Sequence, residues 1–173
     1  MPQERRQAIL EILEKSAKPV KGGELAETLG VSRQVIVQDI ALLRAEGQSI
    51  VATPQGYFLI KNYNNNEKRS LRVFACQHDN KGIEEELKII VANGGRVLDV
   101  MVDHPLYGEL KGNLMLESID EVEQFLKNLN KSGAEPLSVL TKGIHLHTVE
   151  ASSQVILDNI QEELKKANLL VKS

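Results

Sequence analysis

The chain has 173 residues, of which 42% are hydrophobic and 26% are charged, and its formal net charge is -3 at pH 7. This length suffices for one large or two small globular domains, each with a buried core. A single cysteine excludes an internal disulfide and a zinc ribbon, so a metal site would consist mainly of histidine and carboxylate. The sequence shows no run of 18 apolar residues and no secretory leader, and we expect a cytoplasmic protein with no membrane contact.

A polar stretch, KNYNNNEKRS over residues 61–70, interrupts the apolar periodicity, and half of it is Asn or Ser. This composition is typical of a linker, so we predict one domain over residues 1–60 and another over residues 71–173. The first 60 residues carry seven basic and seven acidic side chains, and the rest of the chain carries fourteen and seventeen. The overall negative charge therefore does not exclude nucleic-acid binding by a local surface.

The first predicted domain combines three helices with a hairpin. Apolar side chains recur at helical spacing in residues 4–16, 24–30 and 32–47. Gly30 is suited to end the second helix, and Ser32 is suited to cap the third. Two helices joined by a tight turn form a helix-turn-helix, and residues 49–60 predict two short strands that form a wing.

The solvent face of the third helix is suited to reading bases. It carries Arg33, Gln34, Val37, Gln38, Ala41 and Arg44. In the major groove Arg pairs with guanine, Gln pairs with adenine, and small apolar side chains contact the thymine methyl. We therefore predict binding to double-stranded DNA, with a packing or dimerisation module as the alternative.

The segment KGGELAETLGVSRQVIVQDIALLRAEG resembles the winged helix-turn-helix of the biotin repressor and related bacterial regulators. In those proteins the turn and the following helix contact DNA. The resemblance implies that Ser32, Arg33, Gln34 and Gln38 do so here. Phosphate contacts would come from basic residues near this surface, with Arg5, Arg6, Lys18, Lys21, Lys68 and Arg69 as candidates.

From residue 71 the pattern alternates between strand and helix in the order β-α-β-β-α-β-β-α. This order predicts an α+β sandwich with helices on one face of a mostly antiparallel sheet. The stretch LSVLTKGIHLHTVEA, residues 137–151, is predicted to be two strands divided at Gly143.

Four side chains of the second domain are predicted to converge. His145 and His147 lie on one face of a strand because side chains alternate. His78 ends the first strand, and Glu86 borders the inward stripe of the following helix. Three nitrogens and a carboxylate suit zinc, nickel, cobalt or iron. Cys76 is either a fifth donor or a buried core thiol, and the core thiol is the commoner case.

The motifs QHDNKGIEEEL, VMVDHPLYGEL and GIHLHTVEA resemble those of the 3H domain. Together with the winged helix-turn-helix they resemble a NiaR-type transcriptional repressor, which senses nicotinic acid and represses genes of NAD synthesis and niacin uptake. The resemblance implies nicotinic acid as co-repressor and one divalent metal, nickel or zinc, held by His78, Glu86, His145 and His147. We expect a homodimer because typical operators have two-fold symmetry.

Two further residues, His104 and Tyr107, fall in a predicted turn at a strand end. They either anchor this loop or help to form the effector pocket beside the metal. Two other functions remain open at this point: a repressor for which the metal is the signal, and a metallohydrolase with Asp79 or Asp103 as general base.

Overall fold

The computed structural model describes residues 1–60 and 69–172. The chain divides into two compact units, residues 1–65 and 66–173, which we call the N-terminal and C-terminal units. Of the predicted linker, residues 61–68 lie outside the described part of the chain, and Ser70 already belongs to a strand. Among the described residues no helix is long and apolar enough to cross a membrane.

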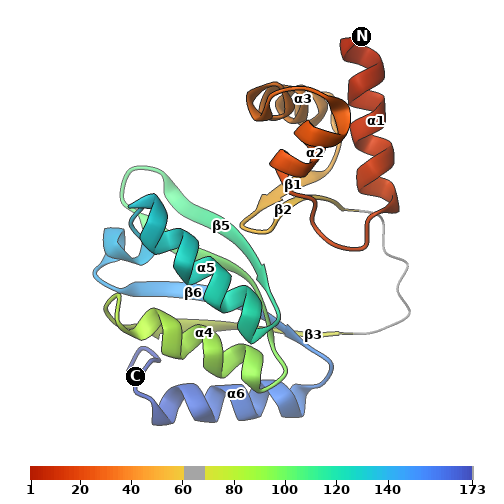
Figure 1. Ribbon diagram of the computed structural model, residues 1–173. Coiled ribbons are helices and arrows are strands. Elements are labelled where there is room, and N and C mark those ends of the chain that lie inside the picture. The colour runs from red at the N-terminus through yellow and green to blue at the C-terminus, as the bar shows by residue number, and fades with distance from the viewer. Residues whose placement is uncertain (61–68, 173) are drawn as a thin grey trace. The chain divides into compact units, whose positions relative to one another are not determined.

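The N-terminal unit contains three helices and a two-stranded hairpin, in the predicted order (Figure 1). Its elements are α1 (Pro2–Lys15), α2 (Gly22–Leu29), α3 (Arg33–Ala45), β1 (Ile50–Thr53) and β2 (Gly56–Leu59). Gly30 ends α2 with a φ of 66°, and Ser32 Oγ accepts a hydrogen bond from the Val35 backbone N–H at 3.3 Å. Both predicted helix boundaries are therefore confirmed, and so is the wing.

One apolar core joins these elements. Its buried side chains are Ile9, Leu13, Val20, Leu25, Ala26, Ile36, Ile40, Leu43, Ile50 and Leu59. Burial of each Leu or Ile contributes about 1.5–3 kcal/mol, so packing fixes the direction of α3. The wing is attached to the chain before α2, since Val20 and Tyr57 exchange backbone hydrogen bonds of 2.8 Å. A Cβ at Gly56 would lie 2.4 Å from the Val20 carbonyl oxygen, which explains the glycine at this turn.

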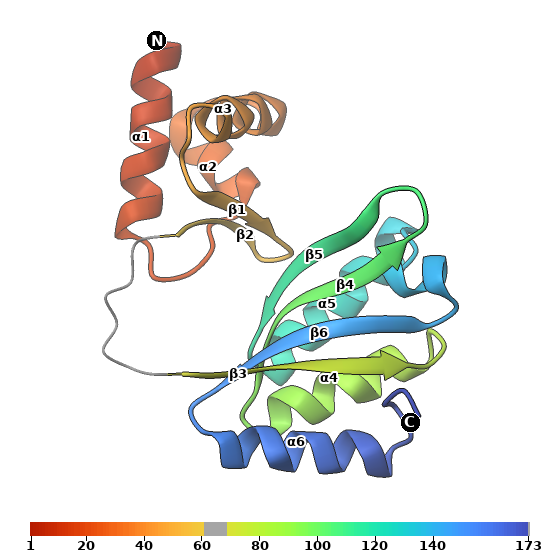
Figure 2. The same ribbon diagram turned by 180° about the vertical axis from the view of Figure 1, so that it is seen from behind.

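The C-terminal unit is a four-stranded antiparallel sheet with helices on one face, which confirms the predicted α+β class. Its strands are β3 (Ser70–Gln77), β4 (Arg96–His104), β5 (Gly108–Leu116) and β6 (Ile144–Ala151). Its helices are α4 (Gly82–Ala92), α5 (Ile119–Ser132) and α6 (Gln154–Lys166). The strands lie in the order β3-β6-β4-β5. Figure 2 shows the sheet from the face that the helices leave open.

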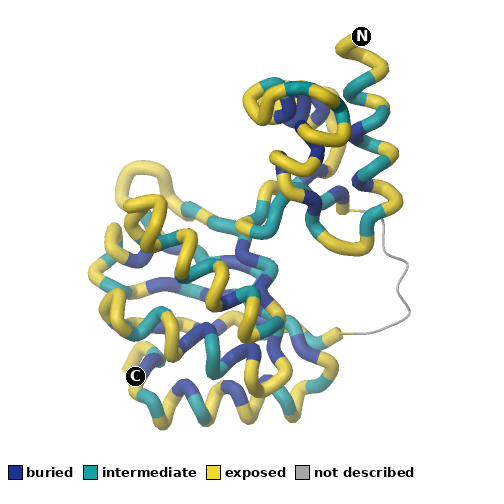
Figure 3. The backbone as a smooth tube through the Cα atoms, viewed as in Figure 1, coloured by how far each residue is buried: buried dark blue, intermediate teal, exposed yellow. Residues whose placement is uncertain are grey.

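The core of this unit lies between the sheet and its helices. Along β6 every second side chain is buried, and exposed and buried positions also alternate along the helices (Figure 3). The largest fully buried apolar side chains are Leu87, Ile90, Val97, Leu116, Val122, Leu157, Ile160 and Leu164. The face of β6 that carries His145 and His147 therefore points into the protein.

One predicted strand is wrong. Residues Leu137–Thr141 form a short 3₁₀ helix, η1, and the strand begins only at Ile144. The β-branched Val139 and Thr141 favour a strand, but local turn geometry prevails. Lys142 adopts a left-handed conformation with a φ of 53°, and the Gly143 N–H donates to the Ser138 carbonyl at 2.8 Å. The observed order is β-α-β-β-α-η-β-α.

Candidate functional site

The antiparallel pairing of β3 with β6 aligns a row of inward-pointing side chains. Cys76 lies directly opposite His145, and His147 follows two residues further along β6. His78 comes immediately after β3, and its backbone N–H donates to the Gly143 carbonyl at 3.4 Å. Since side chains two residues apart share a face of a strand, both strands direct their polar groups to the same side.

Glu86 approaches this row from α4. Of the three consecutive glutamates, Glu84 and Glu85 are exposed, whereas Glu86 is only 1% exposed. Leu87 and Ile90, on the same side of α4, are buried in the core. The apolar stripe of the helix therefore directs this one carboxylate toward the sheet.

Two glycines make room for His78: Gly82, which sequence reasoning missed, and Gly143, which it assigned only as the point that divides two strands. A Cβ on Gly82 would lie 2.6 Å from Cγ of the His78 ring, and a Cβ on Gly143 would lie 2.4 Å from the His78 carbonyl oxygen. Gly143 also has a φ of +88°, which favours glycine. In the sequence, only their proximity to His78 and His145 could have indicated this role.

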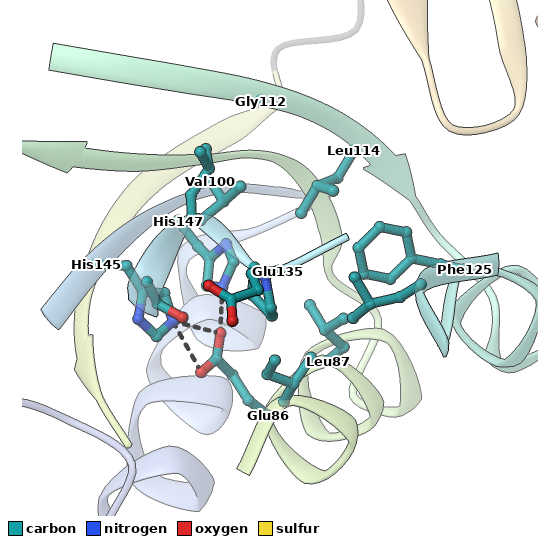
Figure 4. A pocket seen from close by; sticks show the side chains of 14 residues that line it. Glu86, Leu87, Val100, Gly112, Leu114, Phe125, Glu135, His145 and His147 are labelled. Carbon is teal, nitrogen blue, oxygen red and sulfur yellow. Dashed lines mark hydrogen bonds and ion pairs between the residues drawn. The ribbon is translucent and has the colours of Figure 1, made fainter. Parts of the chain in front are cut away.

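The three imidazoles direct the same atom, Nε2, at the Glu86 carboxylate (Figure 4 draws two of them). His145 Nε2 lies 3.0 and 3.1 Å from the two carboxylate oxygens. Nε2 of His147 contacts Oε1 of Glu86, and Nε2 of His78 contacts Oε2 but makes no hydrogen bond of normal geometry. The structure thus brings together all four residues that were predicted to converge.

The other ring nitrogen of each histidine is held by a backbone carbonyl. His78 Nδ1 lies 2.7 Å from the Asp79 oxygen, and His145 Nδ1 lies 2.8 Å from the Gly143 oxygen. His147 Nδ1 lies 2.7 Å from the carbonyl oxygen of Asp99 on β4. A carbonyl only accepts hydrogen bonds, so each Nδ1 carries a proton and donates it. When the rings are neutral, every Nε2 then carries a lone pair that faces the Glu86 carboxylate.

Such an arrangement requires positive charge between the groups. Burial alone would raise the pKa of Glu86, but the adjacent His147 and His145 outweigh this effect and lower it to about 2. Burial would lower the pKa of His147, yet the Glu86 anion raises it. Burial, and then the Glu86 charge, raise the pKa of the Cys76 thiol. Glu86 is thus an anion that needs either protonated imidazoles or a cation beside it.

The donor set fits a divalent transition metal. Three imidazole Nε2 atoms and a carboxylate are ligands that zinc and nickel accept, and a carbonyl on the opposite ring nitrogen is the usual partner of a metal-bound histidine. Cys76 Sγ, a Glu86 oxygen and a His145 nitrogen also lie within 4.8 Å of one another. The four predicted residues could therefore hold such an ion, with Cys76 next to it.

A cavity of about 230 Å³ opens beside this cluster, and Glu86, His145 and His147 form part of its wall (Figure 4). The rest of its wall is mainly apolar, with Ile83, Leu87, Val100, Leu114, Phe125, Leu129, Pro136 and Leu137. Glu135 and Ser138 add two polar groups. The cavity is suited to a small, largely apolar ligand with one polar end that reaches the cluster.

His104 and Tyr107 do not line this cavity. They flank the turn between β4 and β5, where Tyr107 is 70% exposed. His104 Nδ1 accepts hydrogen bonds from the backbone N–H groups of Leu106 and Tyr107 at 3.1 and 3.2 Å. This geometry matches the loop-anchor alternative, and a role in effector binding stays a prediction.

In the N-terminal unit, the face of α3 predicted to read bases is exposed. Solvent reaches Arg33, Gln34, Val37, Gln38, Ala41 and Arg44, and it also reaches Ser32. Hydrogen-bond donors and acceptors of this surface are therefore free to meet a DNA groove.

Behind this surface lies an ion pair that sequence reasoning missed. Asp39, 3% exposed, accepts from Arg5 Nε at 2.5 Å, and Arg6 lies 3.9 Å from it. Of the predicted phosphate contacts, Arg5 is thus bound within the domain and Arg69 pairs with Glu150 at 3.1 Å, while Lys68 lies outside the described residues. The sequence could have indicated this ion pair, because Asp39 is an acidic residue on the apolar side of α3.

A helix-turn-helix with a wing and an exposed polar recognition helix defines the class of DNA-binding transcription regulators. The family described as "HTH domain" matches residues 5–58, and the family described as "3H domain" matches residues 71–173. The probable transcription repressor NiaR of Thermotoga maritima is 47% identical over 169 residues, which cover 98% of this chain and 94% of that protein. The transcription repressor NadR of Bacillus subtilis is 42% identical over 168 residues, which cover 97% and 93%.

The chain belongs to the NiaR/NadR family of transcription repressors, as its resemblance to NiaR-type repressors predicted. Its relatives are named as repressors and not as enzymes. The protein is accordingly a DNA-binding repressor, and the metallohydrolase alternative is set aside.

Proposed function

We propose that the protein is a cytoplasmic, homodimeric repressor of NAD synthesis and niacin uptake genes, with nicotinic acid as co-repressor sensed by a metal-containing C-terminal unit. One observation carries the sensor: three imidazoles direct their Nε2 atoms at one buried carboxylate, while carbonyls hold their Nδ1 atoms. Buried polar groups need partners, and a bound ion would satisfy all four at once.

The proposed metal ligands are His78, Glu86, His145 and His147, and the proposed ion is nickel or zinc. When bound, the ion would supply a positive charge and a coordination position at the wall of the adjacent cavity. The carbonyls of Asp79, Gly143 and Asp99 orient the rings so that little reorganisation accompanies binding.

Nicotinic acid combines a flat aromatic ring with a carboxylate and a pyridine nitrogen. The cavity of about 230 Å³ lies below the usual range of roughly 300–1,000 Å³ for drug-sized ligands, which suits a single ring. Its apolar wall would pack on the ring, and either polar group of the ligand could meet the metal. Phe125 and Val100 line the cavity, whereas His104 and Tyr107, the predicted effector contacts, do not.

A calorimetric titration of metal-loaded protein with nicotinate tests this assignment. We expect Val100→Phe, which fills the cavity, to weaken binding at least tenfold, and Val155→Phe, at an exposed site on α6, to leave it unchanged. His104→Ala forms a separate arm, because a loss of affinity there would support a contribution of the turn. Unchanged affinity in Val100→Phe would contradict the cavity as the binding site.

For DNA, we propose that Ser32, Arg33, Gln34 and Gln38 contact the operator. The loss of a base contact reduces the free energy of DNA binding by about 1–3 kcal/mol, so Gln38→Ala should weaken operator binding about 5- to 150-fold. The free energy of unfolding should stay within about 0.5 kcal/mol, because Gln38 is exposed. Two-fold operators imply two copies of the chain, which sedimentation of the complex would detect.

A second candidate is a repressor for which the metal itself is the signal. It is favoured by the depth of the cluster, because Glu86 and His145 are only 1% and 3% exposed and a bound ion would link α4 to β6 inside the core. Operator affinity measured with and without nicotinate at constant metal concentration separates the candidates. A nicotinate effect supports co-repression, and its absence supports metal sensing.

A further inference from the structure

Cys76 is a polar group of the buried cluster to which the proposed function assigns no role. It is 0% exposed, and its sulfur lies 4.0 Å from the Phe74 carbonyl oxygen. A buried cysteine is commonly just a small apolar core residue. The position of this one, however, is unusual within the sheet, because its partner across the β3–β6 ladder is His145.

Cross-strand partners have Cβ atoms about 4.5–5.5 Å apart and point to the same face. Cys76 and His145 therefore meet the Glu86 carboxylate together, and their donor atoms and a Glu86 oxygen lie within 4.8 Å of one another. Donors held by one ion at about 2.3 Å for sulfur and about 2.1 Å for nitrogen are at most about 4.4 Å apart. The three atoms thus lie near the spacing that a shared ion requires, and binding would draw them closer together.

A second observation points to an ion at this place. His78 Nε2 is buried, makes no hydrogen bond of normal geometry and is directed at the same carboxylate. Charge balance supports a thiolate ligand as well: Glu86 is the one anion among the four other proposed ligands, so a bound dication would leave one positive charge on that ligand set. A buried charge without a partner is costly, and one thiolate would make the site neutral.

We propose that Cys76 is a fifth protein ligand of the metal, bound as a thiolate, and that it makes the site selective for softer ions. This inference rests on the proposed metal site. Binding breaks the S–H bond and releases its proton to solvent as the sulfur–metal bond forms, since a coordinating thiol is deprotonated. Thiolate ligands favour zinc, nickel or cobalt over manganese or magnesium. A site of three histidines and one carboxylate discriminates less strongly between these two groups of ions.

Cobalt(II) titration of the metal-free, full-length protein tests the proposal directly. The chain has one cysteine, so any thiolate-to-cobalt charge-transfer band in the near ultraviolet comes from Cys76. We expect this band in the parent protein and its loss in Cys76→Ser and Cys76→Ala, although both variants still bind cobalt through the other donors. Zinc affinity in competition with a chelator should fall at least about tenfold, with a smaller loss for manganese.

The outcomes separate this inference from the metal site beneath it. A parent protein that binds one cobalt without the near-ultraviolet band overturns the role of Cys76 and leaves the other four ligands intact. A parent protein that binds no cobalt contradicts the metal site and the inference together. Thermal unfolding of the metal-free variants identifies any general packing defect, because Cys76→Ala keeps an apolar side chain in the core while Cys76→Ser does not.

Discussion

Two regions of the C-terminal unit use histidine in opposite ways. In the cluster around Glu86 the ring nitrogen Nδ1 donates to a backbone carbonyl, so in the neutral ring Nε2 carries a lone pair. In the β4–β5 turn the same atom of His104 accepts from two backbone N–H groups, so in the neutral ring Nε2 carries the proton. The first arrangement is suited to a metal, and the second anchors a turn.

The backbone, and not the residue type, therefore selects the task of an imidazole in this unit. Carbonyl oxygens surround these rings because the fold brings together the end of β3, the start of β6 and the middle of β4 there. The turn after β4 instead presents free N–H groups, since Pro105 cannot donate and the next two residues can.

The largest effect should follow from removing the buried carboxylate. We expect Glu86→Gln to lower zinc or nickel affinity at least about 100-fold, the upper end of what even indirect partners of metal ligands contribute. Competition with a chelator measures it. Glu85→Gln is the matched control because Glu85 is the exposed neighbour on the same helix. Equal affinities in the two variants would contradict the metal site.

The stability of the metal-free protein should depend on pH in a defined direction. The pKa of Glu86 is lowered from 4.5 to about 2, so its contribution is complete above pH 4.5 and is lost as the pH falls toward 2. The pKa of His147 is raised above 6.5, so its contribution is complete below pH 6.5 and is lost as the pH rises through the raised value.

From these two groups we expect maximum stability between pH 4.5 and 6.5, with an acid-side loss on the order of 1–3 kcal/mol. Urea unfolding over a pH series measures it. Added zinc should remove the decline above pH 6.5, because the ion takes the place of the imidazole proton. A Glu86→Gln variant with the same pH profile as the parent would refute this account.

A smaller effect should follow from crowding one ring. Gly82→Ala places a Cβ 2.6 Å from the His78 ring and should move its Nε2 away from the cluster. We expect about a tenfold loss of metal affinity, in the range for residues that orient ligands. Gly23→Ala is the control, since nothing lies within 4 Å of a Cβ there. Parent-like affinity in Gly82→Ala would show that the precise position of His78 is unimportant.

The smallest effect should arise in the turn. We expect His104→Ala to destabilise the protein by about 0.5–1 kcal/mol, because water replaces the lost acceptor at this exposed site. His104→Asn should destabilise the protein less than His104→Ala, since Asn side chains accept hydrogen bonds from backbone N–H groups two residues on. Metal affinity should not change in either variant, and a change would place His104 functionally with the buried cluster.

Much of the fold and of the candidate site could be predicted because it depends on local periodicity. Alternation along β6 placed His145 and His147 on one face, and helical spacing singled out Glu86 from its two neighbours. The 3₁₀ helix Leu137–Thr141 was mistaken for a strand because turn geometry outweighed β-propensity. Asp39 was missed because its partner Arg5 lies 34 residues earlier.

Which side chains point toward the core follows from the order of residues along each strand and helix, because backbone geometry directs neighbouring side chains regardless of the rest of the protein. What these side chains meet in the core depends on how the strands and helices pack. The Asp99 carbonyl that orients His147 comes from β4, 48 residues earlier in the chain. The glycines that make room for His78, and the pairing of Cys76 with His145, likewise exist only once β3, β6 and α4 have packed together.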